Sequence, residues 1–127
     1  MPVLIGIDYG SKRVGVALSD ERGAVAFPRT TYPNNHKLIP TLAELIQEKK
    51  VTAAVVGDSR NMKGEENPIA ADIKQFAAHL KAKTAIPVHF EPEFYTSVEA
   101  RRTTGKSVVD AESAAIILNS YITRTAS

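Results

Sequence analysis

Three acidic residues stand where segments of the chain are expected to begin or end, and their side chains suit the chemistry of a divalent metal ion. They are Asp8, Glu93 and Asp110. Hard cations such as Mg²⁺ or Mn²⁺ prefer oxygen ligands, and converging carboxylates can hold two such ions about 3.5–4 Å apart. A pair of this kind hydrolyses phosphodiester bonds, because one ion activates water while the other stabilises the leaving oxygen. Asp8, Glu93 and Asp110 are therefore candidate metal ligands and catalytic residues.

Asp8 ends a segment that has the two-residue period of a β-strand. Val3, Ile5 and Ile7 fall on one face of this segment, while Asp8 falls on the other. Two further alternating segments follow, each separated from the last by turn residues. Together they predict a three-stranded antiparallel meander over residues 3–8, 14–18 and 24–32.

The rest of the chain alternates between helical spacing of apolar residues and short apolar runs typical of buried strands. The expected elements are a helix over 37–50, a strand over 51–56, a helix over 69–80, a strand over 86–90 and a last helix from about 107 to 122. This order predicts an α/β fold with a mixed sheet and helices on its faces. The first, fourth and fifth strands should be neighbours, so their carboxyl ends should bring the three acidic residues together.

Each acidic residue also has a purely structural interpretation. Asp8 precedes Gly10 and suits a turn, and Asp110 completes a capping box that starts at Ser107. Glu93 follows Pro92 and suits an exposed loop. Only the expected convergence of all three favours the metal site over these alternatives.

The composition restricts the class of protein. The chain has 127 residues, the size of one domain, so a single domain over 1–127 is expected. It has no cysteine, which excludes disulfides, thiolate metal sites and cysteine nucleophiles. The net charge of +2 permits a polyanionic partner without requiring one. No apolar run approaches the roughly 20 residues of a membrane helix, and neither a signal peptide nor a membrane anchor is expected, so a cytoplasmic location is expected.

Four motifs carry a resemblance to a known family. They are GIDYGSKRVGVALSD, VVGDSRNMKG, TSVEA and DAESAAIILNSYI, in this order along nearly the whole chain. Together they resemble the RuvX/YqgF family of Holliday junction resolvases, also described as pre-16S rRNA nucleases. The resemblance implies an RNase H-like fold, with a five-stranded mixed sheet whose first three strands are antiparallel and with helices on both faces.

The resemblance also implies an activity and a site. The activity is that of a divalent-metal endonuclease, using Mg²⁺ or Mn²⁺, that acts on structured nucleic acid. Maturation of the 5′ end of precursor 16S rRNA is the favoured function, and resolution of branched DNA is the alternative. The acidic positions of the family's motifs correspond to Asp8, Glu93 and Asp110.

The chain departs from the family pattern close to these positions. The family has Asp-Glu-Arg after the fifth strand, where this chain has Pro92, Glu93 and Phe94. The missing arginine, suited to phosphate by its planar guanidinium, raises the alternative of a catalytically weak relative that only binds nucleic acid. Glu91 is an alternative ligand to Glu93, and Asp58 is a candidate additional ligand.

Basic and amide side chains near the same edge are candidates for binding nucleic acid, since contacts to phosphates supply affinity without reading sequence. The alternative is ordinary solvated surface charge. Two tyrosines, Tyr9 and Tyr95, are candidates for stacking on an unpaired base. The candidate phosphate-binding residues are Lys12, Arg13, Arg60, Asn61, Lys63, Arg101, Arg102 and Lys106.

A second class of function starts from the first motif. Residues 8–12 and 14–17 also resemble the first phosphate loop of the sugar kinase and actin-like ATPase fold. Those proteins clasp a nucleotide between two such domains, and this chain has the length of one. Binding of ATP would distinguish this hypothesis from the nuclease. Either a monomer or a homodimer is compatible with the sequence.

Overall fold

The structure is a computed structural model that describes residues 3–59, 70–93 and 106–125. Its strands and helices alternate in the order that the sequence predicts. They are β1 (Val3–Tyr9), β2 (Arg13–Ser19), β3 (Ala26–Pro33), α1 (Leu38–Lys49), β4 (Val51–Ser59), α2 (Ala70–Thr84), β5 (Val88–Glu93) and α4 (Lys106–Thr125).

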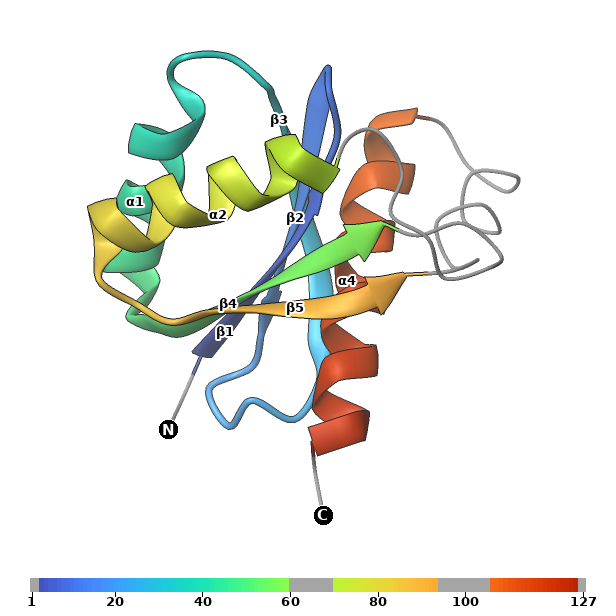
Figure 1. Ribbon diagram of the computed structural model, residues 1–127. Helices are drawn as coiled ribbons and strands as arrows, with labels where there is room; N and C mark the ends of the chain where they lie inside the picture. The colour runs from blue at the N-terminus through green and yellow to red at the C-terminus, as the bar shows by residue number, and fades with distance from the viewer. Residues whose placement is uncertain (1–2, 60–69, 94–105, 126–127) are drawn as a thin grey trace.

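The five strands form one mixed sheet in the order β3-β2-β1-β4-β5 (Figure 1). The first three strands pair antiparallel, whereas β1 pairs parallel with β4 and β4 parallel with β5. The meander and the neighbouring first, fourth and fifth strands are thereby confirmed. The carboxyl ends of β1, β4 and β5 consequently meet at one edge of the sheet.

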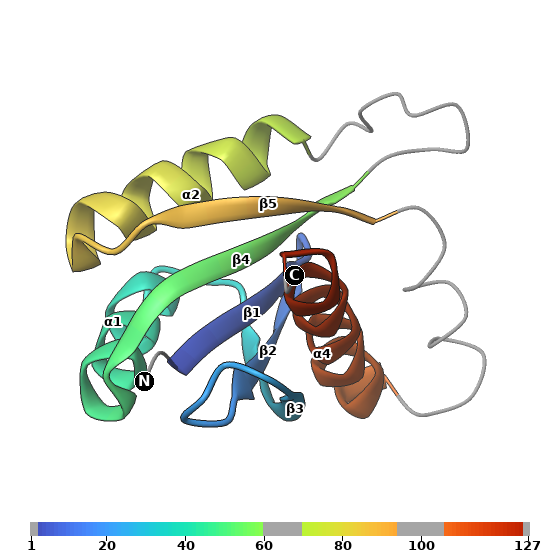
Figure 2. The same ribbon diagram turned by 90° about the horizontal axis from the view of Figure 1, so that it is seen from below.

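The helices cover both faces of the sheet, as predicted. Figure 2 shows α4 on one face and α1 and α2 on the other. Ile5 and Ile7 of β1 are fully buried in the cluster that includes α1 and α2, and Leu4 packs instead against the cluster that includes α4. The two-residue period of β1 therefore builds two separate cores.

Small residues let α4 lie close to the middle of the sheet. Ala17 of β2 packs with Ala114 and Ala115 of α4 in one buried cluster. A Cβ atom at Gly6 of β1 would lie only 2.7 Å from the carbonyl oxygen of Ala114. Since a larger side chain at Gly6 would push the helix away, these residues set how closely α4 approaches β1 and β2.

Two strands extend further toward the site than the sequence predicts. β4 continues past Val56 to Ser59, and β5 continues past Phe90 to Glu93. Their added residues pair with each other, because Asp58 lies opposite Pro92 and Ser59 opposite Glu93. Pro92 is tolerated because β5 is an edge strand.

The turn between β2 and β3 lies at the opposite end of β2 from the expected site. The Asp20 carboxylate accepts hydrogen bonds from the backbone N–H groups of Ala24 (2.8 Å) and Val25 (3.3 Å). The hydrogen bond from Ala24 is the main reason that the pKa of Asp20 lies below its ordinary value of 3.8. This turn is therefore organised around a carboxylate that prefers to be ionised.

Candidate active site

Asp8 lies at the carboxyl end of β1, in the middle of the sheet. Asp8 is only 8 % exposed. Asp8 pairs with Gly15 of β2 across the antiparallel ladder, so the two residues face the same side of the sheet with their Cα atoms about 5 Å apart. Any residue that packs over Gly15 on this face of the sheet therefore also lies close to Asp8.

The residue that lies over Gly15 is Asp110, in the first part of α4. A Cβ atom at Gly15 would overlap the backbone carbonyl of Asp110 and would lie 2.9 Å from the backbone nitrogen of Ala111. Only glycine permits so close an approach between strand and helix. Gly15 therefore brings Asp110, which is 8 % exposed, to the side of Asp8.

Asp110 has a cationic partner, Arg13, which lies on β2, the strand that also carries Gly15. The Nε–H of Arg13 donates a hydrogen bond to Asp110 Oδ2 at 2.7 Å. The Asp110 side chain is 11 % exposed and that of Arg13 is 42 % exposed. This charge-assisted bond offsets the cost of holding a carboxylate at a largely buried position next to a second one.

Glu93 is the last residue of β5, and its backbone lies opposite Ser59 at the same edge of the sheet. Its side chain is outside the described part of the structure. Among the described residues no group of three or more His, Cys, Asp or Glu side chains gathers as a metal site would require. The structure thus brings Asp8 and Asp110 together, and the third ligand remains a prediction.

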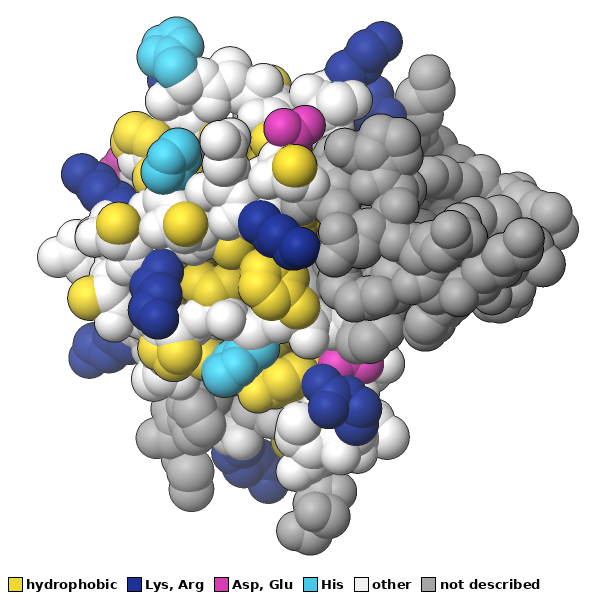
Figure 3. Space-filling view, viewed as in Figure 1, with side chains coloured by type: hydrophobic (Ala, Val, Ile, Leu, Met, Phe, Trp, Pro, Cys, Tyr) yellow, Lys and Arg dark blue, Asp and Glu magenta, His cyan; other side chains and the backbone are white. Residues whose placement is uncertain are grey.

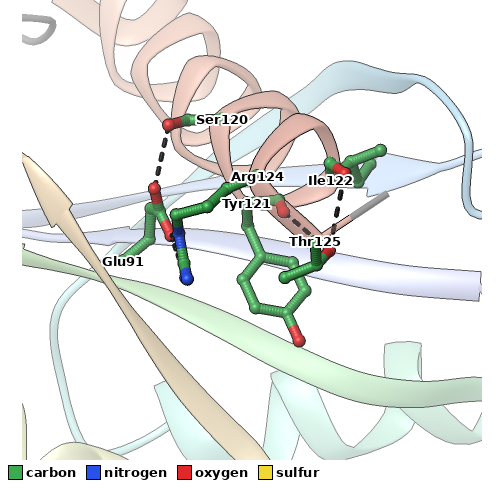
Figure 4. A network of polar contacts seen from close by, with 6 residues as sticks. All are labelled: Glu91, Ser120, Tyr121, Ile122, Arg124 and Thr125. Carbon is green, nitrogen blue, oxygen red and sulfur yellow. Dashed lines mark hydrogen bonds and ion pairs between the residues drawn. The ribbon is translucent and has the colours of Figure 1, made fainter. Parts of the chain in front are cut away.

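Glu91 has a structural role rather than a place beside Asp8. Its residue is 4 % exposed, and its carboxylate accepts hydrogen bonds from the Ser120 hydroxyl (2.9 Å) and from Nε and Nη2 of Arg124 (2.9 and 2.6 Å) (Figure 4). Ser120 lies about 15 Å further along α4 than Asp110. Glu91 therefore fastens the far part of α4 to β5, and the interpretation of Glu91 as a substitute metal ligand is not supported.

Comparison with known proteins identifies the family of this chain. The sequence pattern of the RuvX family, described as Holliday junction resolvase, matches residues 2–124. The chain belongs to the RuvX family. A relative from Moorella thermoacetica named "Putative pre-16S rRNA nuclease" is 36 % identical over 132 residues, covering 95 % of this chain and 94 % of the relative. A relative of the same name from Lachnospira eligens is 39 % identical over 133 residues, covering 94 % and 95 %.

The fold of this RuvX chain is similar to that of a protein of known structure. The chain superposes on Thermus thermophilus RuvC in complex with a Holliday junction substrate, with a TM-score of 0.66 and 13 % identity over 99 % of this chain and 97 % of that one. This likeness confirms the predicted RNase H-like fold. Together with the family match, it supports a nuclease rather than a nucleotide-binding fragment.

In this RuvX chain the Asp110 carboxylate has a partner outside its own helix, whereas the side chain of Ser107, its predicted capping partner, lies outside the described side chains. α4 already begins at Lys106, one residue before the predicted cap Ser107, which is a difference within the usual spread of helix bounds. The Asp110 carboxylate is bound by Arg13 of a different element. Asp110 is therefore held at the sheet by tertiary contacts.

The predicted nucleic-acid-binding residues are only partly described. Lys12 is exposed just before β2, and Arg13 is the partner of Asp110. Among the described side chains on the face that carries α2 and β5, lysines and arginines are scattered around an apolar centre rather than gathered in one patch (Figure 3). Those outside the described residues, or described without their side chains, are Arg60, Asn61, Lys63, Arg101, Arg102 and Lys106, together with Phe94, Tyr95 and the side chain of Asp58.

Tyr9 lies on the face of the sheet opposite Asp8, because neighbouring residues of a strand point to opposite sides. Its ring packs against that of Phe76 of α2, with centroids 4.8 Å apart. Both rings line a shallow pocket of about 170 Å³ together with Asn34, Asp72 and other polar residues. Tyr9 is thus part of the contact between β1 and α2, and its ring borders this pocket.

Sequence reasoning missed two features of the site, namely the contact of Gly15 with α4 and the pairing of Arg13 with Asp110. Gly15 interrupts an alternating apolar strand, and a glycine inside a strand often marks the close approach of another backbone. That signal was sufficient to suspect the helix. The Arg13 pairing spans 97 positions of the chain, and no local pattern reports it.

Proposed function

We propose that this chain is a divalent-metal-dependent endonuclease that matures the 5′ end of precursor 16S rRNA. The observation that carries the proposal is the pairing of Asp8 and Asp110, two largely buried carboxylates, at the carboxyl end of β1 in a member of the RuvX family. The choice of precursor 16S rRNA as the substrate is based on the names of the relatives.

The donor chemistry of this pair fits Mg²⁺ or Mn²⁺. Both residues offer carboxylate oxygens, and Mg²⁺ is commonly held by one or two carboxylates together with substrate phosphates. Glu93, at the end of β5, is the proposed third ligand. When bound, such ions supply an activated water and stabilise the leaving oxygen of a phosphodiester.

The residues of the chain position these charges and receive the substrate. Gly15 fixes the distance between β2 and α4, and hence between Asp8 and Asp110. Lys12, exposed beside the site, is placed to contact a backbone phosphate. No side-chain nucleophile is needed, because the attacking group in this chemistry is water.

A cleavage assay with matched variants tests the proposal. We expect the full chain with Mg²⁺ to cut a precursor 16S rRNA 5′ leader, and we expect EDTA or Asp8→Asn to abolish cutting. Asp8→Asn is nearly isosteric and should keep the fold while removing the charge that the metal requires. Asp20→Asn, the same change at the opposite end of β2, should retain full activity.

The substrates in the assay separate the candidate functions. Four-way DNA junctions belong in it, because the matched family is described as Holliday junction resolvase. Cutting of the junction but not of the RNA leader would replace precursor processing by junction resolution. Binding of either substrate without cutting would favour the weak relative, and unchanged cleavage by Asp8→Asn would refute the proposed site.

A further inference from the structure

The Arg13 guanidinium is hydrogen-bonded to Asp110, whose carboxylate is a metal ligand in the proposed function. We propose that Arg13 serves as the resident cation of Asp110 in the metal-free protein, and that it leaves Asp110 when a divalent cation binds, which frees the guanidinium for a substrate phosphate. This inference rests on the proposed function, because it concerns the same site. It assigns Arg13 a positioning role that alternates between two partners.

Arg13 compensates part of the negative charge that the two carboxylates bring to the site. Asp8 and Asp110 are each 8 % exposed and lie on the same side of the β1–β2 ladder. Two carboxylates held close together with little access to water repel each other. Arg13 supplies a compensating charge at 2.7 Å from Asp110, so the carboxylate can stay in place before any metal arrives.

The Arg13 side chain is held by fewer contacts than its backbone. Arg13 is the first residue of β2, and its backbone pairs with Pro33 of β3. Its side chain is 42 % exposed and reaches Asp110 through one hydrogen bond from Nε among the described contacts. The half-exposed guanidinium keeps contact with water, which competes with Asp110 for its charge. A change of rotamer is therefore enough to release Asp110.

The ion pair at the other end of α4 is held by more hydrogen bonds, although the Arg124 side chain, at 55 % exposed, is more exposed than that of Arg13. Glu91 accepts bonds from two nitrogens of Arg124 and from Ser120, and its side chain is 5 % exposed. That carboxylate has several partners and no role in the proposed site. Arg124 therefore offers an internal comparison for Arg13 within the same molecule.

Repulsion makes the two partners of Asp110 exclude each other. A guanidinium at hydrogen-bond distance and a divalent cation would both be positive and would share one carboxylate. Arg13 displaced from Asp110 remains at the edge of the sheet, where its planar fork suits a phosphate. Metal and nucleic acid should then bind cooperatively, because each favours the same displaced position of Arg13.

Side-chain NMR of the ¹⁵N-labelled full chain tests the exchange without any cleavage. The Nε–H signals of Arg13 and Arg124, assigned with Arg13→Lys and Arg124→Lys, are followed during titration with Mg²⁺. We expect the Arg13 signal to move to the position of solvent-exposed arginines while the Arg124 signal stays. An unmoved Arg13 signal, at Mg²⁺ concentrations that saturate the backbone shifts of Asp8 and Asp110, would overturn the inference and leave the metal site intact. If those backbone signals do not respond either, both proposals fail.

Metal affinity gives a second, independent measurement. Arg13→Gln removes the competing cation, so calorimetric titration with Mn²⁺ should show binding tighter by about 3- to 10-fold. Lys12→Gln removes a neighbouring charge other than the Arg13 partner of Asp110, and it measures the general electrostatic effect, which should stay below about twofold. Equal or weaker binding by Arg13→Gln, in a variant whose backbone spectrum is native, would overturn the inference.

Discussion

Gly15→Ala should impair catalysis by moving one half of the site relative to the other. The added Cβ atom would overlap the Asp110 carbonyl and lie 2.9 Å from the Ala111 nitrogen. Both obstacles are backbone atoms, so no change of rotamer relieves them. The first part of α4 must retreat from β2 by about 1 Å, and Asp110 moves with it away from Asp8.

The expected magnitudes follow from the two consequences of this movement. Overpacking in a core costs about 1–3 kcal/mol of stability, which lowers the melting temperature of a chain of this size by about 3–12 °C. A displacement of about 1 Å at a catalytic group costs roughly 100-fold in rate. We therefore expect Gly15→Ala to fold at 20 °C and to cleave the precursor 16S rRNA leader about 100-fold more slowly than the parent chain.

Gly6→Ala separates loss of stability from loss of alignment. Its Cβ atom would lie 2.7 Å from the Ala114 carbonyl oxygen and from the Leu118 Cβ atom, so it also crowds α4, but at least one turn beyond Asp110. It should lower the melting temperature while reducing the rate by less than about tenfold. A folded Gly15→Ala variant with the parental rate would refute the reasoning. If Gly15→Ala fails to fold, Asp110→Glu, which displaces the carboxylate by one methylene, should show the same loss of rate.

Three other predictions concern the ion pair of Glu91, the turn at Asp20 and the departure from the family pattern at Phe94. Glu91→Gln should lower the free energy of unfolding by about 1–2 kcal/mol in denaturant titration, because it removes a buried charge from its hydrogen bonds, and it should leave cleavage intact; loss of cleavage without loss of stability would contradict its structural role. Asp20→Ala should be less stable than the parent above about pH 4, and the difference should disappear as the pH falls below that value, because the hydrogen bond from Ala24 lowers the pKa of the folded carboxyl; a difference in melting temperature that persists at pH 2 would contradict this assignment. Phe94→Arg, which restores the family's arginine, should raise the cleavage rate, and an unchanged rate would show that the chain does not depend on it.

The fold was predictable because the spacing of apolar residues along each strand indicates which face of the strand is buried. Val3, Ile5 and Ile7 alternate with residues that face α4, and this alternation correctly predicted two covered faces. The bounds were less accurate where pairing overrides local chemistry. Asp58 looks like a turn residue in isolation, yet it continues β4 because β5 pairs with it.

The site was predictable as far as the order of the strands determines it. Asp8 and Asp110 lie close to each other, because β1 is central and α4 approaches the neighbouring strand β2 at Gly15, which pairs with Asp8. Glu91 was a candidate ligand because it is acidic and near a strand end. The sheet twists, as sheets do, and α4 contacts Glu91 of β5 through Ser120, about 15 Å along the helix from Asp110 (Figure 4). The crossing angle depends on packing of the whole domain, which no local pattern contains.

In the proposed mechanism Asp8 and Asp110 hold a catalytic divalent cation at the carboxyl end of β1. Crystals of the full chain soaked in Mn²⁺, at a concentration that supports cleavage, test it through the anomalous signal of the metal. We predict an anomalous peak bound by the carboxylates of both residues, and no such peak in Asp8→Asn crystals. Mn²⁺ bound elsewhere, with neither carboxylate among its ligands, would contradict the account.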